Sequence, residues 1–229
     1  MENDFSYVGE NLERIRENVR EACAKAGRSE DSVRIMAVTK TVAPEIVNYA
    51  IQQGIDLLGE NRVQEFLSKK DSYLEAEVHM IGHLQTNKVK YIINDVSMIQ
   101  SVDSEKLLSE ISRLAVKNGR TMDILCEVNI GGEDSKSGIA PGELRGLLEK
   151  AAQTEGVRLR GLMTIPPPSD SDIFLGKMKE LYDSFAGEFS LDVLSMGMTH
   201  DYAAAVRMGS TLVRVGTGLF GARDYSQKR

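Results

Sequence analysis

A lysine ends a short apolar run near the start of the chain, and its position suggests covalent chemistry. The run "RIMAV" (34–38) is rich in strand-forming residues, so Lys40 would carry its amine to the end of a buried strand. An amine whose proton affinity is lowered by desolvation or by a nearby cation condenses with a carbonyl carbon to form a Schiff base. The competing interpretation is a lysine that reaches out into water, the more common fate of lysines.

Two later loops place glycines and hydroxyl side chains directly after apolar runs. They are "SMGMTHD" (195–201) and "VRVGTG" (213–218). Glycine lets the backbone approach a ligand, and hydroxyl groups with free N–H groups at a helix start bind anions. Either loop alone reads as an ordinary turn, but the pair indicates a phosphate site. Asp201 would repel the anion unless its carboxylate points away. The candidate residues are Gly197, Thr199, Gly216, Thr217 and Gly218.

Arg214 bears on which carbonyl compound Lys40 would meet. A lysine opposite a phosphate site fits a phosphorylated aldehyde, either a sugar phosphate or pyridoxal 5′-phosphate (PLP). Arg214 lies two residues before the second loop, so its guanidinium could meet a ring whose phosphate that loop holds. A pyridine nitrogen accepts a hydrogen bond from this permanent cation and stays unprotonated, which favours PLP. A buried arginine paired with an Asp or Glu is an equal alternative.

Short apolar runs that alternate with helical segments would position these residues. The connections are too long for hairpins, which indicates parallel strands with crossover helices. About eight such units in 229 residues predict an α/β protein, a single (β/α)₈ TIM barrel. An open doubly wound sheet is the alternative. The runs cover residues 33–38, 56–59, 78–82, 97–101, 123–130, 158–165, 191–196 and 211–216.

The chain before the first run reads as an extra amphipathic helix. Apolar residues recur at helical spacing over 12–26, and Gly27 is placed to end the helix. Because no linker or charge block follows, we predict one domain over 1–229, with the N-terminal helix in 1–27 and the barrel in 33–221. Further helix starts are predicted at Pro44, Asp103 and Pro141.

The carboxyl ends of barrel strands meet at one mouth, where the chemistry of such folds is found. Lys40 is the only lysine at a predicted strand end, which favours a role in the site. The segment 131–138 lacks the spacing of a P-loop, and we interpret it as a loop over the mouth with Lys136 as a candidate ligand contact. The polar residues at predicted strand ends are Lys40, Glu60, Asn61, His83, Ser101, Asp103, Asn129, Thr164, Ser195 and Arg214.

Composition excludes several classes of function. The net charge is −6 and no basic stripe appears, so we expect no nucleic-acid partner. Cys23 and Cys126 lack the spacing of a metal site or a disulfide framework, and "HMIGH" (79–83) reads as a strand, so we expect no metal. No signal peptide or membrane-spanning run appears, so we expect a cytoplasmic protein with no membrane partner.

Seven segments together resemble the pyridoxal phosphate homeostasis proteins, the YggS/PROSC family. The resemblance runs in order through nearly the whole chain, and it implies a monomeric TIM barrel of PLP fold type III, similar to the N-terminal domain of alanine racemase. The segments are "AVTKT" (37–41), "GENRVQE" (59–65), "HMIGHLQTNK" (79–88), "VNIGGEDSKSG" (128–138), "RGLMTIPPP" (160–168), "LSMGMTHD" (194–201) and "GSTLVRVGTGLFGARDYS" (209–226).

The resemblance also implies roles for individual residues. Lys40 would hold PLP as an internal aldimine, Arg214 would face the pyridine nitrogen, and Asn61 would lie near the ring. The phosphate would be held by Thr199, Gly216 and Thr217 together with the backbone near Ser195 and Gly197.

This chain departs from the family pattern at three positions. Val78 stands where many members have an aromatic residue, Thr199 where many have serine, and Val42 where many have a second lysine. A role for that second lysine in PLP exchange therefore does not carry over.

The resemblance implies a protein of PLP homeostasis without robust catalysis, whose recipients would be PLP-dependent apoenzymes. The alternatives are an amino-acid racemase-like enzyme and, less favoured, a Schiff-base aldolase. Racemases of this fold take a second base, a tyrosine, from a further domain, and we expect none here because the chain ends just after its last barrel unit. Tyr7, Tyr202 and Tyr225 lie at no predicted strand end, so we assign no catalytic residue.

Overall fold

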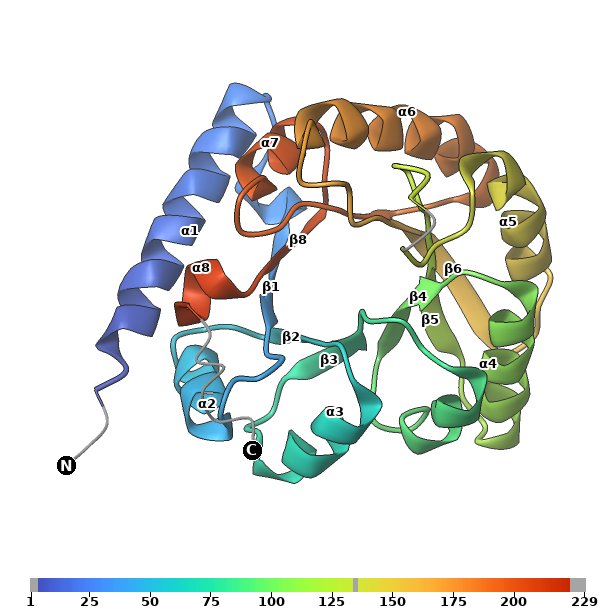
Figure 1. Ribbon diagram of the computed structural model, residues 1–229, viewed down its shortest axis with the longest axis horizontal. Coiled ribbons are helices and arrows are strands. Elements are labelled where there is room, and N and C mark those ends of the chain that lie inside the picture. The colour runs from blue at the N-terminus through green and yellow to red at the C-terminus, as the bar shows by residue number, and fades with distance from the viewer. Residues whose placement is uncertain (1–3, 134–135, 223–229) are drawn as a thin grey trace.

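Eight parallel strands close into a barrel in the computed structural model, which describes residues 4–133 and 136–222 (Figure 1). Each strand pairs with the next along the chain, and the last pairs with the first, with Ala37 opposite Val215. The predicted (β/α)₈ barrel is thus confirmed, and the open sheet is wrong. The strands are β1 Arg34–Val38, β2 Leu57–Glu60, β3 Glu77–Met80, β4 Met98–Val102, β5 Met122–Glu127, β6 Val157–Met163, β7 Val193–Ser195 and β8 Leu212–Val215.

Helices surround the barrel and cover the outer face of its strands. Strands buried on both faces read as nearly continuous apolar runs, which is why the sequence locates them well. The third crossover, between β3 and β4, contains only a 3₁₀ helix, Thr86–Tyr91. The helices are α1 Ser6–Lys25, α2 Pro44–Gln52, α3 Val63–Lys69, α4 Glu105–Lys117, α5 Leu144–Ala152, α6 Ser171–Phe189, α7 Tyr202–Arg207 and α8 Thr217–Phe220, with short 3₁₀ helices at Glu30–Ser32, Lys70–Ser72 and Pro141–Glu143.

The predicted helix boundaries are largely confirmed, with one wrong cap. Gly27 follows α1 with φ 64°, the left-handed conformation that glycine adopts at low cost. Pro44 is the first residue of α2. The cap of α4 is Ser104 rather than Asp103, because the Ser104 side chain accepts the hydrogen bond from the N–H of Leu107.

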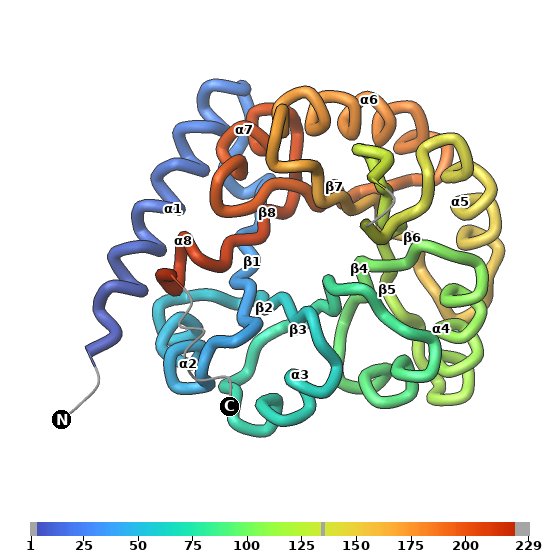
Figure 2. The backbone as a smooth tube through the Cα atoms, viewed as in Figure 1, coloured from blue at the N-terminus to red at the C-terminus, as the bar shows by residue number. Residues whose placement is uncertain are grey.

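Helix α1 lies against the side of the barrel where the chain's first and last strands meet (Figure 2). Nδ2 of Asn18 donates to the hydroxyl of Tyr202 at 2.7 Å, and Nδ2 of Asn11 donates to the carbonyl of Leu219 at 3.0 Å. The extra helix therefore supports α7 and α8, the elements that follow the two glycine loops. Within the described ranges, no helix is long and apolar enough to cross a membrane.

Candidate functional site

A cavity of about 170 Å³ lies at the carboxyl end of the barrel. Six of the eight predicted site residues line it, contributed by the ends of β1, β2, β7 and β8, so parallel pairing has brought together residues that are far apart in the sequence. The cavity is lined by Val38, Lys40, Asn61, Ile81, Ile165, Met198, Thr199, His200, Arg214, Gly216 and Thr217.

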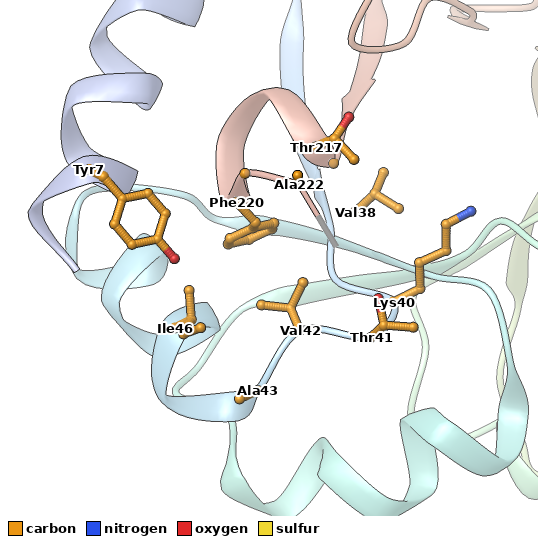
Figure 3. A pocket seen from close by; sticks show the side chains of 12 residues that line it. Tyr7, Val38, Lys40, Thr41, Val42, Ala43, Ile46, Thr217, Phe220 and Ala222 are labelled. Carbon is orange, nitrogen blue, oxygen red and sulfur yellow. The ribbon is translucent and has the colours of Figure 1, made fainter. Parts of the chain in front are cut away.

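A second cavity, of about 270 Å³, adjoins the first at Lys40. Tyr7 and Phe220 belong to the second alone, and four residues line both: Val38, Lys40, Gly216 and Thr217. Figure 3 shows Tyr7 and Lys40 at opposite ends of this second cavity, with the Phe220 ring between them. Since Arg214 and Thr199 line only the smaller cavity, that cavity is the better candidate for a charged, phosphorylated ligand.

The turn that follows Lys40 is held by α3. Thr41 has φ 63°, an unfavourable conformation for a β-branched residue. Oε1 of Glu65 accepts a hydrogen bond from the N–H of Thr41, and Nζ of Lys69 donates to the carbonyl of Thr39 at 3.2 Å. Burial alone would raise the pKa of the Glu65 carboxyl, but hydrogen bonds from Lys69 and Thr41 outweigh it and hold that pKa below its ordinary value.

Hydroxyl and N–H groups converge where the two glycine loops meet. Oγ1 of Thr199 accepts from the N–H of Gly218 at 3.1 Å and from the hydroxyl of Thr217 at 3.3 Å. The carboxylate of Asp201, which the sequence suggested could repel an anion, is engaged elsewhere: its Oδ1 accepts from the N–H of Met198 at 2.6 Å. The loops thus present Thr199 and Thr217 to the cavity while the carboxylate serves its own turn.

Arg214 is buried, and its fixed partners are neutral oxygens. Nη1 donates to the carbonyl and the hydroxyl of Ser195 at 2.8 and 2.6 Å, and Nη2 donates to the carbonyl of Thr164 at 2.7 Å. Among the described residues Arg214 makes no ion pair, so the alternative of an arginine paired with Asp or Glu is wrong. Burial lowers its pKa to about 10, against the attraction of Glu127 and Asp201, and the group stays a cation at neutral pH.

Two predicted phosphate residues do not line the cavity. Ser195 is fully buried beneath Arg214. Gly197 has φ 93°, and its carbonyl accepts from the N–H of Arg214 at 3.0 Å. A side chain at Gly197 would place a Cβ only 2.5 Å from Cβ of Ala205, so this glycine is required by packing as well as by conformation.

Other polar residues at strand ends turn away from the cavity. Glu60 accepts hydrogen bonds from the hydroxyls of Thr39 and Tyr73, both at 2.7 Å, outside the barrel wall. His83 is exposed and lies 3.6 Å from Asp103. Only the first two residues of "HMIGH" lie in β3, which ends at Met80, so the strand is shorter than predicted; none of the segment is helical.

The predicted end of β5 is wrong. The apolar run suggests a strand to residue 130 with Asn129 at its end, but β5 ends at Glu127. Asn129 instead organises the next loop, where Nδ2 donates to the carbonyl of Glu133 at 2.8 Å. Lys136 pairs with Glu133 in the same loop.

Glu127 is a buried carboxyl that the sequence did not single out. Its side chain is 5% exposed, and Oε2 has no hydrogen-bond partner in the part of the chain that the structure describes. Burial, and then the charge of Asp103, raise its pKa to about 7 despite the nearby Arg214. Glu127 is the last residue of β5, so a correct strand boundary would have made it a candidate site residue.

The predicted candidates for a second base are not gathered around the smaller cavity. Tyr202 is buried, and its hydroxyl is engaged by Asn18. Tyr7 lines only the adjoining cavity. Tyr225 lies outside the described residues.

Comparisons with known proteins give a consistent result. The family described as the alanine racemase N-terminal domain matches residues 11–224. The pyridoxal phosphate homeostasis protein of Aquifex aeolicus is 43% identical over 224 residues, covering 94% of this chain and 98% of the relative. The protein of the same name from Escherichia coli K12 is 34% identical, covering 99% of this chain and 100% of the relative.

Solved structures share the whole barrel. PipY of Synechococcus elongatus, solved with PLP bound, superposes with a TM-score of 0.82 at 29% identity, covering 93% of this chain and 100% of that one. Alanine racemase of Clostridium difficile superposes with a TM-score of 0.76, but at 15% identity and over 57% of its own length, which indicates a shared fold alone.

Proposed function

We propose, from the premise that this chain belongs to the pyridoxal phosphate homeostasis protein family, that it binds PLP and serves in PLP homeostasis without robust catalysis. The observation that carries the proposal is the joint lining of one small cavity by Lys40, Arg214 and the Thr199–Thr217 pair. An amine, a cation and a hydroxyl-rich turn are the groups that an aldehyde, a pyridine nitrogen and a phosphate require.

Two features of the cavity fit this ligand. Oδ1 of Asn61 is buried and has no hydrogen-bond partner within the described residues, so it has an acceptor to offer a ring substituent. A Cβ at Gly218 would come within 3.0 Å of Thr199 and of Val215. Only glycine at this position therefore lets the backbone of the proposed phosphate turn pack this closely against Thr199.

Each residue would have a separate task in holding the ligand. The neutral amine of Lys40 would bond to the aldehyde carbon with loss of one water molecule, after giving up a proton. Thr199 and Thr217, with the backbone of 216–218, would bind the phosphate. Arg214 would donate to the pyridine nitrogen, as the resemblance implies for this position.

The charge of Arg214 favours storage over turnover. Bound PLP supplies a pyridine ring that withdraws electrons most strongly when its nitrogen is protonated. Because Arg214 stays a cation at neutral pH, it would keep a proton off that nitrogen and weaken the withdrawal. The racemase-like alternative also needs a base on each face of the substrate, and Tyr7 lies at the far end of the adjoining cavity from Lys40 (Figure 3).

Further parts of the proposal concern the setting in which the protein works. We expect a cytoplasmic monomer that releases PLP to PLP-dependent apoenzymes. The two cysteines are buried and unpaired, as is usual in a reducing compartment. Light scattering should give the mass of one chain, 25.3 kDa.

The decisive experiment is reductive labelling. PLP added to the purified protein should produce a visible absorption band that borohydride removes, leaving a pyridoxyl group on the peptide that contains Lys40. The Lys40→Ala variant should give no labelled peptide, and Lys117→Ala, which removes an exposed lysine of α4, should label normally. Absence of the band in the wild type, or label on other lysines alone, would refute PLP binding at this site. Steady amino-acid turnover that depends on Lys40 would refute the carrier role.

A further inference from the structure

A continuous line of hydrogen-bonded side chains crosses the interior of the barrel and ends at Arg214. Nη1 of Arg214 donates to Oγ of Ser195 at 2.6 Å, and the Ser195 hydroxyl donates to Oε1 of Gln100 at 2.7 Å. Nε2 of Gln100 lies 2.8 Å from Nδ1 of His79, and Nε2 of His79 lies 2.8 Å from Oε1 of Glu77. We call Glu77, His79, Gln100 and Ser195 the barrel relay.

The relay joins opposite walls of the barrel. Arg214 and Ser195 belong to β8 and β7, Gln100 to β4, and His79 to β3. The buried side chains of the line, each at most 2% exposed, are those of Arg214, Ser195, Gln100 and His79. Barrel interiors are normally filled by branched apolar residues, and here the relay lies beside two small apolar clusters. The clusters are Met36, Val38, Leu57, Ile81 and Leu212, and Met98, Leu125 and Met163.

Buried polar groups of this kind are costly unless each is satisfied, so the directions of their bonds are constrained. The carboxylate of Glu77 can only accept, so Nε2 of His79 carries a proton and donates to it. Nδ1 of a neutral His79 then accepts from the amide of Gln100, whose oxygen accepts from Ser195. Each bond of the line then joins one donor to one acceptor. With the Gln100 amide reversed, the Ser195 hydroxyl would lose its acceptor.

The far end of the relay is fixed by a second arginine. Nη1 of Arg34 donates to Oε2 of Glu77 at 2.8 Å, so both carboxylate oxygens are engaged. The hydrogen bond from His79, helped by Arg34 and opposed by burial, lowers the pKa of Glu77 to about 2. Glu77 is therefore ionised at neutral pH, which fixes the first acceptor of the relay.

The near end decides how Arg214 is held. Two of its three acceptors, the carbonyls of Ser195 and Thr164, are parts of the backbone and cannot turn. The third, Oγ of Ser195, can rotate, and the hydrogen bond from its own proton to Gln100 holds it in the position where it accepts from Arg214.

We propose that Gln100 and His79 are positioning residues for Arg214: through Ser195 they lock the guanidinium in the orientation that faces the cavity. The consequence for PLP rests on the proposed function, whereas the orientation of Arg214 in the free protein does not.

The first test reads Arg214 directly, by NMR of the ligand-free protein with ¹⁵N-labelled arginine. A locked guanidinium gives separate, slowly exchanging Nη signals, and Arg214→Lys assigns them. Ser195→Ala should broaden or merge these signals. Gln100→Glu should shift them without merging them, because a carboxylate accepts from Ser195 where the amide accepted. Ser210→Ala is the matched control. Ser210 is equally buried, and its hydroxyl lies within hydrogen-bond distance of the carbonyls of Leu194, Met196 and Leu212 rather than of the relay.

The second test reads the direction of the relay. The chain has three histidines, so ¹⁵N-histidine spectra are assigned by replacing the exposed His83 and His200 with asparagine. His79 should be neutral with its proton on Nε2, and Gln100→Glu should protonate Nδ1 as well. A wild-type proton on Nδ1, or Arg214 signals unchanged in both relay variants, would overturn the inference. If Ser195→Ala does not fold, the His79 tautomer and Gln100→Glu still decide it.

The third test connects the relay to the ligand. Ser195→Ala should weaken PLP binding by about three- to tenfold and move the absorption maximum of bound PLP, whereas Ser210→Ala should leave the maximum unchanged. Unchanged affinity and maximum in Ser195→Ala would overturn the effect on PLP. A wild type that binds no PLP would refute the proposed function, and the Arg214 signals would still decide whether the relay positions that side chain.

Discussion

Oε1 of Glu65 accepts a hydrogen bond from the backbone N–H of Thr41 at 2.5 Å, although 24 positions separate the two residues in the chain. The bond fixes the turn immediately after Lys40, in which Thr41 takes a left-handed conformation. Such a conformation in a β-branched residue persists only where the surroundings hold it. Helix α3 therefore helps to determine where the Lys40 amine points.

Glu65→Ala should weaken that turn. We expect the free energy of unfolding to fall by about 1–3 kcal/mol, because the substitution leaves the Thr41 N–H without its acceptor and the largely buried Lys69 amine without its carboxylate partner. The rate of PLP uptake should fall as well. Urea unfolding and stopped-flow absorbance measure the two effects. Glu75→Ala, at an exposed position, is the control and should change neither. Equal behaviour of the two variants would contradict the assigned role.

The acid dependence of this contact follows from the lowered pKa of Glu65. A carboxyl whose pKa is lower in the folded state stabilises the protein above its ordinary value of 4.5, and the stabilisation is lost as the pH falls through the folded pKa. Wild type should therefore lose stability below about pH 4.5 more steeply than Glu65→Gln. Parallel unfolding curves on acidification would show that Glu65 makes no such contribution.

The hydroxyl of Thr199 should be separable from its methyl group. Thr199→Ser keeps the oxygen that accepts from Gly218 and Thr217, whereas Thr199→Val keeps the shape and loses that oxygen. We expect Thr199→Val to weaken PLP binding by roughly tenfold and Thr199→Ser by less than about twofold, since one hydrogen bond to a charged group is lost only in the first. Fluorescence titration measures both. Similar losses in the two variants would point to packing rather than phosphate binding.

Much of this architecture could be predicted because each buried strand leaves a continuous apolar run and each run ends near the mouth. Lys40, Asn61 and Arg214 were located in this way, and the structure places all three on one cavity. The relay could not be predicted. Gln100 lies inside a predicted strand rather than at its end, and only the closed barrel brings it to Ser195, 95 positions away.

The misplaced end of β5 has a physical cause. The run continues with Val128 and Ile130, which are apolar, but the pairing of β5 with β6 ends at Glu127, and Val128 forms an isolated bridge with Ile139 instead. Apolar character alone does not distinguish a strand from an extended segment that packs on the core. Glu127 was overlooked for that reason, although a carboxyl inside the predicted strand was a signal that could have been followed.

Glu127→Gln should remove a pH dependence of stability. The pKa of Glu127 is raised to about 7 from 4.5, so the protonated form favours folding, and this contribution is lost as the pH rises from about 4.5 through about 7. Above that range the variant should be more stable than wild type, by at most about 3 kcal/mol, and below it the two should be equal. Thermal unfolding over a pH series checks this. If the wild type were instead more stable than Glu127→Gln at high pH, the attraction between ionised Glu127 and Arg214 would outweigh the cost of burying the Glu127 carboxylate.

The backbone of Asn61 leaves no room for a side chain at Gly82, and Gly146, which has open space around it, provides the control. A Cβ at Gly82 would lie 2.3 Å from the carbonyl oxygen of Asn61 and 2.8 Å from its Cα, so Gly82→Ala must displace the backbone that brings Asn61 to the cavity. We expect a loss of about 1–3 kcal/mol in the free energy of unfolding and weaker PLP binding.

Gly146, within α5, has no atom within 4 Å of the Cβ position. Gly146→Ala should therefore stabilise the protein by about 0.5–1 kcal/mol with PLP binding unchanged, because alanine is the better helix former. Urea unfolding and PLP titration of both variants measure the contrast, and a Gly82→Ala protein that binds PLP like wild type would show that the position of Asn61 does not matter to the ligand.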